Sequence, residues 1–341
     1  MGNSDPRNHR ARAAGRAALK QTVRLREIAP DAYARDILPL TAPLWAGRRS
    51  FDVYVAQTLE TARSTYGRRH YRTVGLYDGS TLLASFKRYE RSLHDGERQV
   101  RAIGFGAVFT PARYRGRGYA SVMLAAELDR ARSAGYELAY LFSDIRPQFY
   151  ATFGFVELPS RNLTLRADAL PAQRVRPAQL APGDWNGVRR CFESCERERP
   201  AGFVRTQSVW GWISMRVKHG SEHAAGHEFN LVVRRGRRIR AYVLGARVPE
   251  HDTYAVDEYG YTDDDSAALT PALLRAAAGD LRRIKGWLPP ACARDLLPKG
   301  TTRKRTRSIL MMAPLRPQGR GLLDRILAER NGDFCWATEH I

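Results

Sequence analysis

A short stretch rich in glycine and arginine, "YRGRGYA" at residues 114–120, stands out as a site for chemistry. It follows an apolar run, "IGFGAVFTP" at 103–111, and precedes an amphipathic segment over 119–134. A strand, a glycine turn and a helix N-terminus in this order form an anion site, because the first amides of a helix are unpaired and lie at the positive end of its dipole. The glycines let the main chain curl around an oxyanion, and the arginines add positive charge at the rim. The sequence therefore predicts a phosphate or pyrophosphate site.

The composition indicates a globular protein with an anionic partner. The chain has 341 residues, of which 43% are hydrophobic, and a formal net charge of +21. This length favours two domains, and this charge suits a nucleic acid, a membrane surface or a phosphorylated small molecule. No apolar run is long enough for a transmembrane helix, and the four cysteines suit reduced thiols, so we expect a cytoplasmic protein. Residues 1–21 are expected to form a basic, partly disordered arm.

An internal repeat divides the chain in two. The segment "VRLREIAPDAY" at 23–33 resembles "VRPAQLAPGDW" at 175–185, and the segment at 120–135 resembles that at 271–286. Both members of the second pair are predicted to be helices that end in glycine. Between these segments each half contains a predicted hairpin, with turns at Asp78-Gly79 and near Arg235-Gly236. We therefore expect two α/β units, over residues 22–168 and 174–341.

The glycine loop resembles a family signature. Arg115-Gly-Arg-Gly-Tyr-Ala120 fits the pattern [QR]-x-x-G-x-[GA], which is the pyrophosphate loop of the GCN5-related N-acetyltransferase (GNAT) family. After the next predicted strand, at 137–144, Tyr150-x-x-Phe-Gly-Phe155 resembles the family signature Y-x-x-x-GF. The resemblance covers roughly residues 22–168. It implies an α/β (α+β) fold of two tandem GNAT-like units, each a mixed twisted sheet flanked by helices, distantly similar to Eis-type acetyltransferases without their extra C-terminal domain.

The resemblance implies an acetyl-CoA-dependent N-acetyltransferase, in which a primary amine attacks the thioester directly. The acceptor would be a small-molecule or peptide amine, and acetyl-CoA the co-substrate. Tyr150 would protonate the leaving thiolate, although a packing role beside Phe149 is the alternative. The resemblance also implies two sets of cofactor-binding residues. The strand edge for the pantetheine arm would be formed by Ala107, Val108 and Phe109. The main-chain amides for the pyrophosphate would come from Arg115, Gly116, Arg117, Gly118, Tyr119 and Ala120.

The general base is left open by the sequence. Many family members use a glutamate on the fourth strand, but "RAIGFGAVFT" at 101–110 contains none. Asp144, at the end of the fifth predicted strand, is one candidate. The terminal carboxylate of Ile341 is another, because Eis-type enzymes use a chain terminus in this way, and a water chain is the third. Residues that bind the acceptor are expected from the helices at 42–66, where the aromatic candidates, or alternatively core residues, are Trp45, Phe51 and Tyr54.

The second copy is expected to be inert. At its loop position, 266–271, the sequence "SAALTP" has no glycine or arginine, and three aspartates precede it at 263–265. Carboxylates near a helix N-terminus suit the dipole but repel pyrophosphate. We expect a structural unit that shapes the acceptor pocket at the domain interface.

Other clusters give weaker hypotheses. The histidines at 219, 223 and 227 are expected to lie in a solvated loop and not to bind metal, so no metal site is predicted. The basic segment "RRGRRIR" at 234–240 is expected to be a solvated hairpin turn. The competing function is a non-catalytic GNAT-fold module that binds nucleic acid through such basic hairpins. For the enzyme, neither nucleic acid nor membrane is an expected partner, and the oligomeric state is open.

Overall fold

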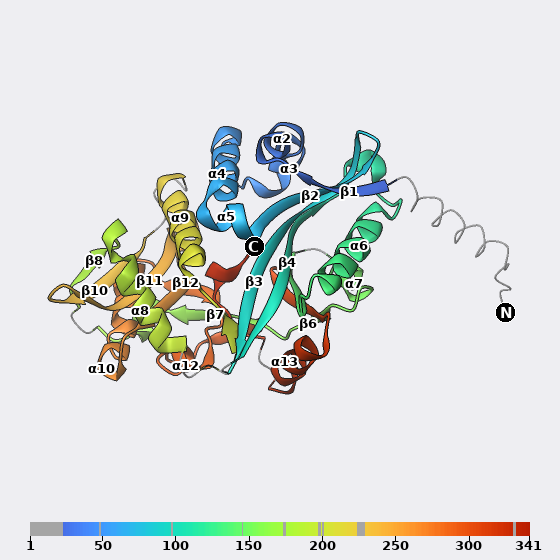
Figure 1. The fold of residues 1–341 in the computed structure, drawn as a ribbon. Helices are drawn as coiled ribbons and strands as arrows, with labels where there is room; N and C mark the ends of the chain where they lie inside the picture. Colours follow the sequence, from blue (N-terminus) through green and yellow to red (C-terminus); the bar gives the residue numbers. More distant parts are fainter. Residues whose placement is uncertain are drawn as a thin grey trace, which may run out of the picture.

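The computed structural model describes residues 23–341, except residues 48, 97, 145, 173–174, 197–198, 200, 224–228 and 330–331. The described residues form two mixed sheets flanked by helices, as the sequence predicts (Figure 1). No helix within them has the length and apolar character needed to cross a bilayer. The predicted arm at 1–21 lies outside the described residues.

The first sheet carries the predicted hairpin and strand. β2 and β3 pair as an antiparallel hairpin whose turn lies at Asp78–Thr81, as expected. Along the sheet the strands lie in the following order: β1 (Val23–Ile28), β2 (Tyr71–Asp78), β3 (Thr81–Asp95), β4 (Arg98–Phe109), β5 (Leu138–Ser143), β15 (Ile309–Pro314) and β6 (Val156–Glu157). A short strand, β9 (Ala201–Phe203), pairs with β3 beside this path.

Helices cover both faces of the first sheet (Figure 1). Four helices lie between β1 and β2 in sequence, and two follow β4 and β5: α2 (Pro30–Asp36), α3 (Leu38–Trp45), α4 (Phe51–Arg63), α5 (Thr65–His70), then α6 (Tyr119–Ser133) and α7 (Pro147–Ala151). α6 buries Met123 and Leu124 against Phe105 of the sheet, in a core that is fully closed to solvent. This apolar face of the amphipathic helix holds the glycine loop at its N-terminus against the end of β4.

The second sheet repeats the strand order of the first, which confirms that the chain contains two similar α/β units. Its strands lie in the following order: β8 (Pro177–Gln179), β10 (Leu231–Arg235), β11 (Arg238–Val248), β12 (Thr253–Tyr261), β13 (Arg283–Trp287), β7 (Arg161–Arg166) and β14 (Thr301–Lys304). The predicted turn near Arg235–Gly236 joins β10 to β11. The longer helices of this half are α8 (Trp185–Glu196), α9 (Gln207–His223), α11 (Thr270–Ala278) and α13 (Pro317–Ala328).

Short helices and 3-10 turns make up the remaining elements. They are α10 (Asp264–Ala267), α12 (Ala291–Arg294), η1 (Ala112–Tyr114), η2 (Ala167–Ala169), η3 (Pro182–Asp184), η4 (Pro249–His251) and η5 (Ala337–Glu339).

The helix predicted over 271–286 is too long. α11 ends at Ala278, because Gly279 adopts a positive φ of 60° and its N–H closes the last turn on Arg275 O. Residues 283–287 form β13 instead, which pairs with β12 on one side and β7 on the other. The apolar pattern changes period after the glycine, and the sequence analysis extended the helix across that change.

Each unit completes the other's sheet by exchanging one strand. β7, at residues 161–166, comes from the first half of the chain but pairs with β13 and β14 of the second sheet. β15, at 309–314, comes from the second half and lies between β5 and β6 of the first sheet. The two sheets therefore do not divide the chain at a single linker. The boundaries at 22–168 and 174–341 stay a prediction about the sequence repeat.

Candidate active site

The first sheet opens between β4 and β5. The two strands pair in parallel from Ala102–Leu138 to Phe105–Leu141, and no pairing follows. Just beyond that point Ala107 has a positive φ of 49°, and the β3–β4 register shifts by one residue. This bulge turns β4 away from β5, so its main-chain groups from Gly106 onward face an opening. An extended ligand with amide groups can pair with such an edge.

The glycine loop lies at the same edge of the sheet. β4 and β5 run parallel, so the loop after β4 and the helix after β5 both follow the carboxyl ends of the strands, where α/β sheets bind ligands. Gly116 and Gly118 have positive φ values of 77° and 80°, and Gly118 is the N-cap of α6. The main-chain amides of residues 116–121 have no hydrogen-bond partner among the described residues. These donors are available to an anion, and the anion site itself stays a prediction.

The arginines of the loop have different roles. Arg115 Nε donates to Thr110 O at 3.1 Å, which fixes the loop to the end of β4. The guanidinium groups of Arg113 and Arg117 lie 4.9 and 5.9 Å from the ring centre of Tyr114. Residues 115–120 do not line the cavity described next; they lie beside it, after β4.

A cavity of about 750 Å³ lies where β4 and β5 separate. Both units contribute to it: Ala107 and Val108 come from β4, while Trp212 comes from α9 and His251 from η4. Phe109 does not line it; its buried ring packs edge-on against Trp45 at 6.5 Å. The opening in the first sheet thus leads into a chamber that the second unit closes.

Tyr150 lines this cavity from α7. Its ring packs at 5.1 Å from Phe149 and 6.2 Å from Phe155, so the packing role considered above is present in the structure. Burial, and to a smaller extent the nearby Asp144 carboxylate, raise the pKa of Tyr150 to about 12. The phenol therefore holds its proton at neutral pH and faces a cavity, as a general acid must.

The end of the polypeptide reaches into the cavity. Ile341 lines it, and the carbon and oxygen of its terminal carboxyl group lie 3.4 and 3.5 Å from the position that a Cβ on Gly106 would take. Its Cδ1 atom lies 2.7 Å from the corresponding position on Gly104. Two glycines on β4 therefore leave the space that the last residue occupies. Figure 1 shows the C-terminus at the centre of the molecule, beside β3 and α5.

A buried charge network fixes this C-terminal end. Glu339 accepts from Arg91 of β3 and from Arg205, both at 2.6 Å. Arg205 also pairs at 2.6 Å with Glu258 of β12, whose carboxylate accepts from Thr338 as well. All these side chains are buried, and two arginines balance two glutamates. Removal of one partner would leave a buried unpaired charge, so the network fixes the tail strongly.

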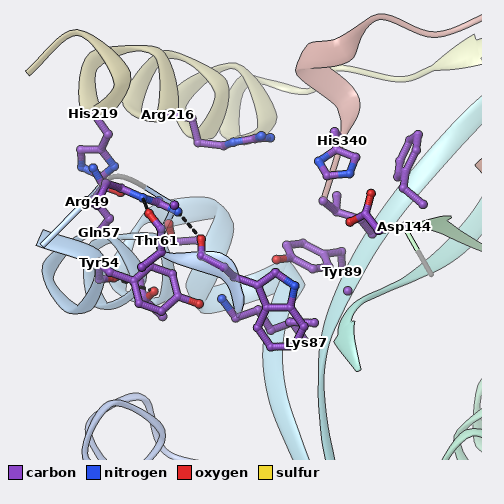
Figure 2. A pocket seen from close by; sticks show the side chains of 18 of the residues that line it. Arg49, Tyr54, Gln57, Thr61, Lys87, Tyr89, Asp144, Arg216, His219 and His340 are labelled. Carbon is purple, nitrogen blue, oxygen red and sulfur yellow. Dashed lines mark hydrogen bonds between the residues drawn. The ribbon is translucent and has the colours of Figure 1, made fainter. Parts of the chain in front are cut away.

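Asp144 also lines the cavity but is already hydrogen-bonded. Its Oδ1 accepts from Ser308 N at 2.9 Å and Ser308 Oγ at 3.2 Å. Figure 2 shows Asp144 and His340 together on one side of the cavity. The structure thus brings three predicted residues, Tyr150, Asp144 and Ile341, to a single chamber.

Two of the three residues that the sequence analysis proposed for acceptor binding line the cavity. Trp45 and Tyr54 line the cavity, whereas Phe51 does not and is 44% exposed. The sequence analysis missed Lys87 and Arg49, which line the cavity from β3 and from the turn after α3 (Figure 2). Lys87, Tyr89 and Arg91 share one face of β3, but this strand pattern alone gives no sign of a cavity.

The second unit has no comparable anion loop among its described residues. At the matching position the Asp263 side chain caps α10 and accepts from Ser266 N at 3.0 Å. Arg240 forms an ion pair with Asp263 at 2.7 Å. The helix that corresponds to α6 is α11, and the amides of residues 266–269 just before it already donate to main-chain oxygens of residues 263–266. These amides are therefore not available to an anion.

The other clusters serve structure. The prediction that a loop begins at residue 219 is wrong for residues 219–223, which form the end of α9. His227 lies outside the described residues. His219 is buried and lies 2.5 Å from Glu60 Oε2. The thiols of Cys191 and Cys195 on α8 are buried and form no disulfide. No three His, Cys, Asp or Glu side chains within the described residues form a group that could bind a metal.

Comparisons with known proteins agree with this geometry. Residues 45–157 match the family model of an acetyltransferase (GNAT) domain. No curated protein sequence matches this one. A solved structure of a conserved protein from Enterococcus faecalis V583, described as a probable N-acyltransferase, is 14% identical, with a TM-score of 0.68 over 88% of this chain and 74% of that chain.

Two further structures share the fold. A GCN5-related N-acetyltransferase from Kribbella flavida is 17% identical, with a TM-score of 0.63 over 87% of this chain and 73% of that chain. Eis1 from Mycobacterium abscessus is 11% identical, with a TM-score of 0.54 over 86% of this chain and 74% of that chain. At these identities the likeness establishes the fold.

Proposed function

We propose that this protein, which carries a GNAT domain at residues 45–157 and repeats the GNAT fold in a second unit, transfers the acetyl group of acetyl-CoA to a primary amine. One observation carries the proposal: the opening between β4 and β5 joins a free anion loop to a cavity that contains Tyr150 and a terminal carboxylate. Fold likeness alone would support acyl transfer only in general terms.

The cofactor would lie along this opening. The amides of residues 116–120 would bind the pyrophosphate, and the β4 edge at 107–109 would pair with the pantetheine arm. The Arg115 amide, which the sequence analysis included, is already used, because it donates to Ala112 O at 3.2 Å. The bulge at Ala107 would direct a main-chain amide at the thioester carbonyl, where charge develops during attack. The residues present suit acetyl-CoA, since the loop has main-chain donors without partners for its pyrophosphate, and β4 has an edge beyond Phe105 that does not pair with β5 for its amide groups.

The protein's own groups would move two protons. The carboxylate of Ile341 would accept one from the acceptor ammonium, and the free amine would attack the thioester carbon. As the C–S bond breaks, Tyr150 would donate its proton to the CoA thiolate, and the second proton that the attacking nitrogen must lose would return to the Tyr150 oxygen. We favour Ile341 over Asp144 as the base, because Ser308 already donates twice to Asp144. Cytoplasmic residence belongs to the proposal and is supported by the free cysteines.

Calorimetry with acetyl-CoA and a CoA-release assay over a panel of primary amines test the proposal. We expect one acetyl-CoA bound per protein molecule, because the amides that precede α11, the second unit's counterpart of α6, already donate to main-chain oxygens. A DNA oligomer serves as the comparison ligand. DNA binding without acetyl-CoA binding would overturn the enzyme and favour a nucleic-acid-binding module.

A further inference from the structure

Two cations line one part of the cavity without a carboxylate partner. Lys87 Nζ has no hydrogen-bond or ion-pair partner among the described residues. Arg49 donates only to neutral oxygens: to Ala46 O at 2.8 Å, Gln57 Oε1 at 2.7 Å and Trp45 O at 2.6 Å. These bonds fix the guanidinium in place but leave its charge, like that of Lys87, uncompensated.

The protein stabilises the Lys87 ammonium only in part. The rings of Tyr33 and Tyr54 lie 5.6 and 5.8 Å from Nζ, within the range of weak cation–π attraction. Burial, and next the charge of Arg49, lower the pKa of Lys87 to about 8. Buried charges without partners are costly, and proteins place them where a ligand completes the pair. The pair of cations thus marks a place for an anion.

The other cations of the cavity differ in their partners. His219 pairs with Glu60 at 2.5 Å. Arg216 forms no ion pair with a carboxylate among the described residues; it donates to Thr338 O at 3.3 Å, and its guanidinium lies 4.8 Å from the ring centre of Trp212. Arg49 and Lys87 lie 5.1 and 5.8 Å from the ring centre of the same Tyr54, so these two cations can act on one ligand group together.

The same cavity also contains carboxylates. Among the described residues they come from Asp144, Glu250 and the terminus at Ile341. Figure 2 shows Arg49 and Asp144 on opposite sides of the chamber, with Lys87 between them. The terminus at Ile341 lies over Gly106, which is the register partner of Lys87, so the cations and the proposed base face one chamber.

We propose that the acceptor is an amine that also carries a carboxylate, bound so that Lys87 and Arg49 hold the carboxylate while the amine reaches the Ile341 terminus. This inference rests on the proposed acetyl transfer and names the acceptor class for that same site. A polycationic acceptor is disfavoured, because a second ammonium would approach two uncompensated cations.

Matched pairs of amines test the acceptor class. The probes are ω-amino acids of increasing length, each beside the alkylamine that lacks only the carboxylate, and aminoalkyl phosphonates separate carboxylate from phosphate-like recognition. We expect kcat/KM to be about 10- to 100-fold higher for the best amino acid than for its alkylamine. Equal values within every pair would overturn the inference, and a preference for the phosphonates would overturn the carboxylate assignment.

Lys87→Met separates recognition from structure. It should reduce the preference to near unity and leave acetyl-CoA affinity unchanged, while Lys87→Arg should retain the preference. Because the substitution removes an unpaired, half-buried cation, Tm should stay level or rise; a lower Tm with the preference intact would assign Lys87 a structural role. Lys285→Met, on the exposed face of β13, is the matched control.

Binding distinguishes the two proposals. Calorimetry with the same amino acids requires no turnover. CoA release without a carboxylate preference contradicts only the acceptor class. Binding of amino acids that depends on Lys87, without release of CoA from any amine, supports the anion site and contradicts acetyl transfer. If no amino acid binds and turnover shows no preference for a carboxylate, the inference about the acceptor class is overturned.

Discussion

Arg91 of β3 forms a buried ion pair with Glu339, two residues before the C-terminus, at 2.6 Å. The pair joins the first sheet directly to the tail of the second half. With Glu339 also held by Arg205, the last two residues have little freedom, and the terminal carboxylate stays above Gly106. A terminus, usually the most mobile part of a protein, is here fixed within the proposed catalytic chamber.

Deletion of Ile341 should reduce kcat by about 10²- to 10⁴-fold, because it moves the terminal carboxylate back by one residue, about 3.5 Å. Acetyl-CoA affinity should not change. Single-turnover measurement of acetyl transfer checks this. Ile341→Ala is the control, since it keeps the carboxylate and removes only side-chain packing. Full activity of the deletion variant would exclude the terminus as the base, and Asp144→Asn would then test the remaining carboxylate.

Gly118→Asp should abolish measurable acetyl-CoA binding and leave the fold intact. The residue has a φ of 80° and open space around its Cβ position, so the substitution adds modest strain and a negative charge at the anion loop. Gly118→Asn separates the two effects, because asparagine tolerates this conformation and is neutral. Calorimetry should show that the Gly118→Asn variant binds acetyl-CoA much more tightly than the Gly118→Asp variant. Unchanged affinity in the Asp variant would remove the site assignment.

Tyr150→Phe should slow the chemical step by about 10²- to 10⁴-fold, with Tm and acetyl-CoA affinity nearly constant. The ring contacts with Phe149 and Phe155 remain, and only the proton donor is lost. Single-turnover rates are needed, since slow product release could hide the effect in kcat. A Phe variant with at least half the wild-type rate, together with an unstable Tyr150→Ala variant, would leave Tyr150 as a packing residue.

His340→Gln should flatten the acid side of the stability curve. Burial, with a smaller contribution from Arg216, lowers the pKa of His340 to about 4 in the folded protein. The unfolded state binds the proton first as pH falls below about 6.5, so wild-type stability should be lost between about pH 6.5 and about pH 4, by up to about 3 kcal/mol from this group.

The variant must be compared with wild type at each pH, because Asp257 contributes the opposite slope. Its burial raises its pKa to about 6, so it stabilises the fold at low pH and loses that contribution as pH rises through about 6. Chemical denaturation of both proteins across this range provides the measurement, with His251→Gln, an exposed histidine, as the control. Parallel curves for wild type and His340→Gln would contradict the neutral, buried imidazole.

The sequence analysis predicted the elements that depend on interactions between residues close together in the chain. The strand, glycine loop and helix at 103–134 depend on φ preference and apolar period, and the structure has all three elements. The exchange of β7 and β15 had no such signal, because an apolar strand pattern does not tell which of two similar sheets it will join. Lys87 has the pattern of an ordinary strand residue, and only the tertiary packing of β3 against α2 and α4 encloses it. The Arg91–Glu339 pair joins residues too distant in sequence for any pattern to relate.

The strand exchange also sets the order in which the protein can be made. During synthesis, β5 of the first sheet is complete once residue 143 has been translated, whereas its neighbour β15 is complete only at residue 314. The nascent first unit therefore has an unpaired, apolar β5 edge while the second half emerges, and such edges invite association with other proteins. Most of the polypeptide must leave the ribosome before either unit is complete, so the two halves mature together as one cooperative folding unit.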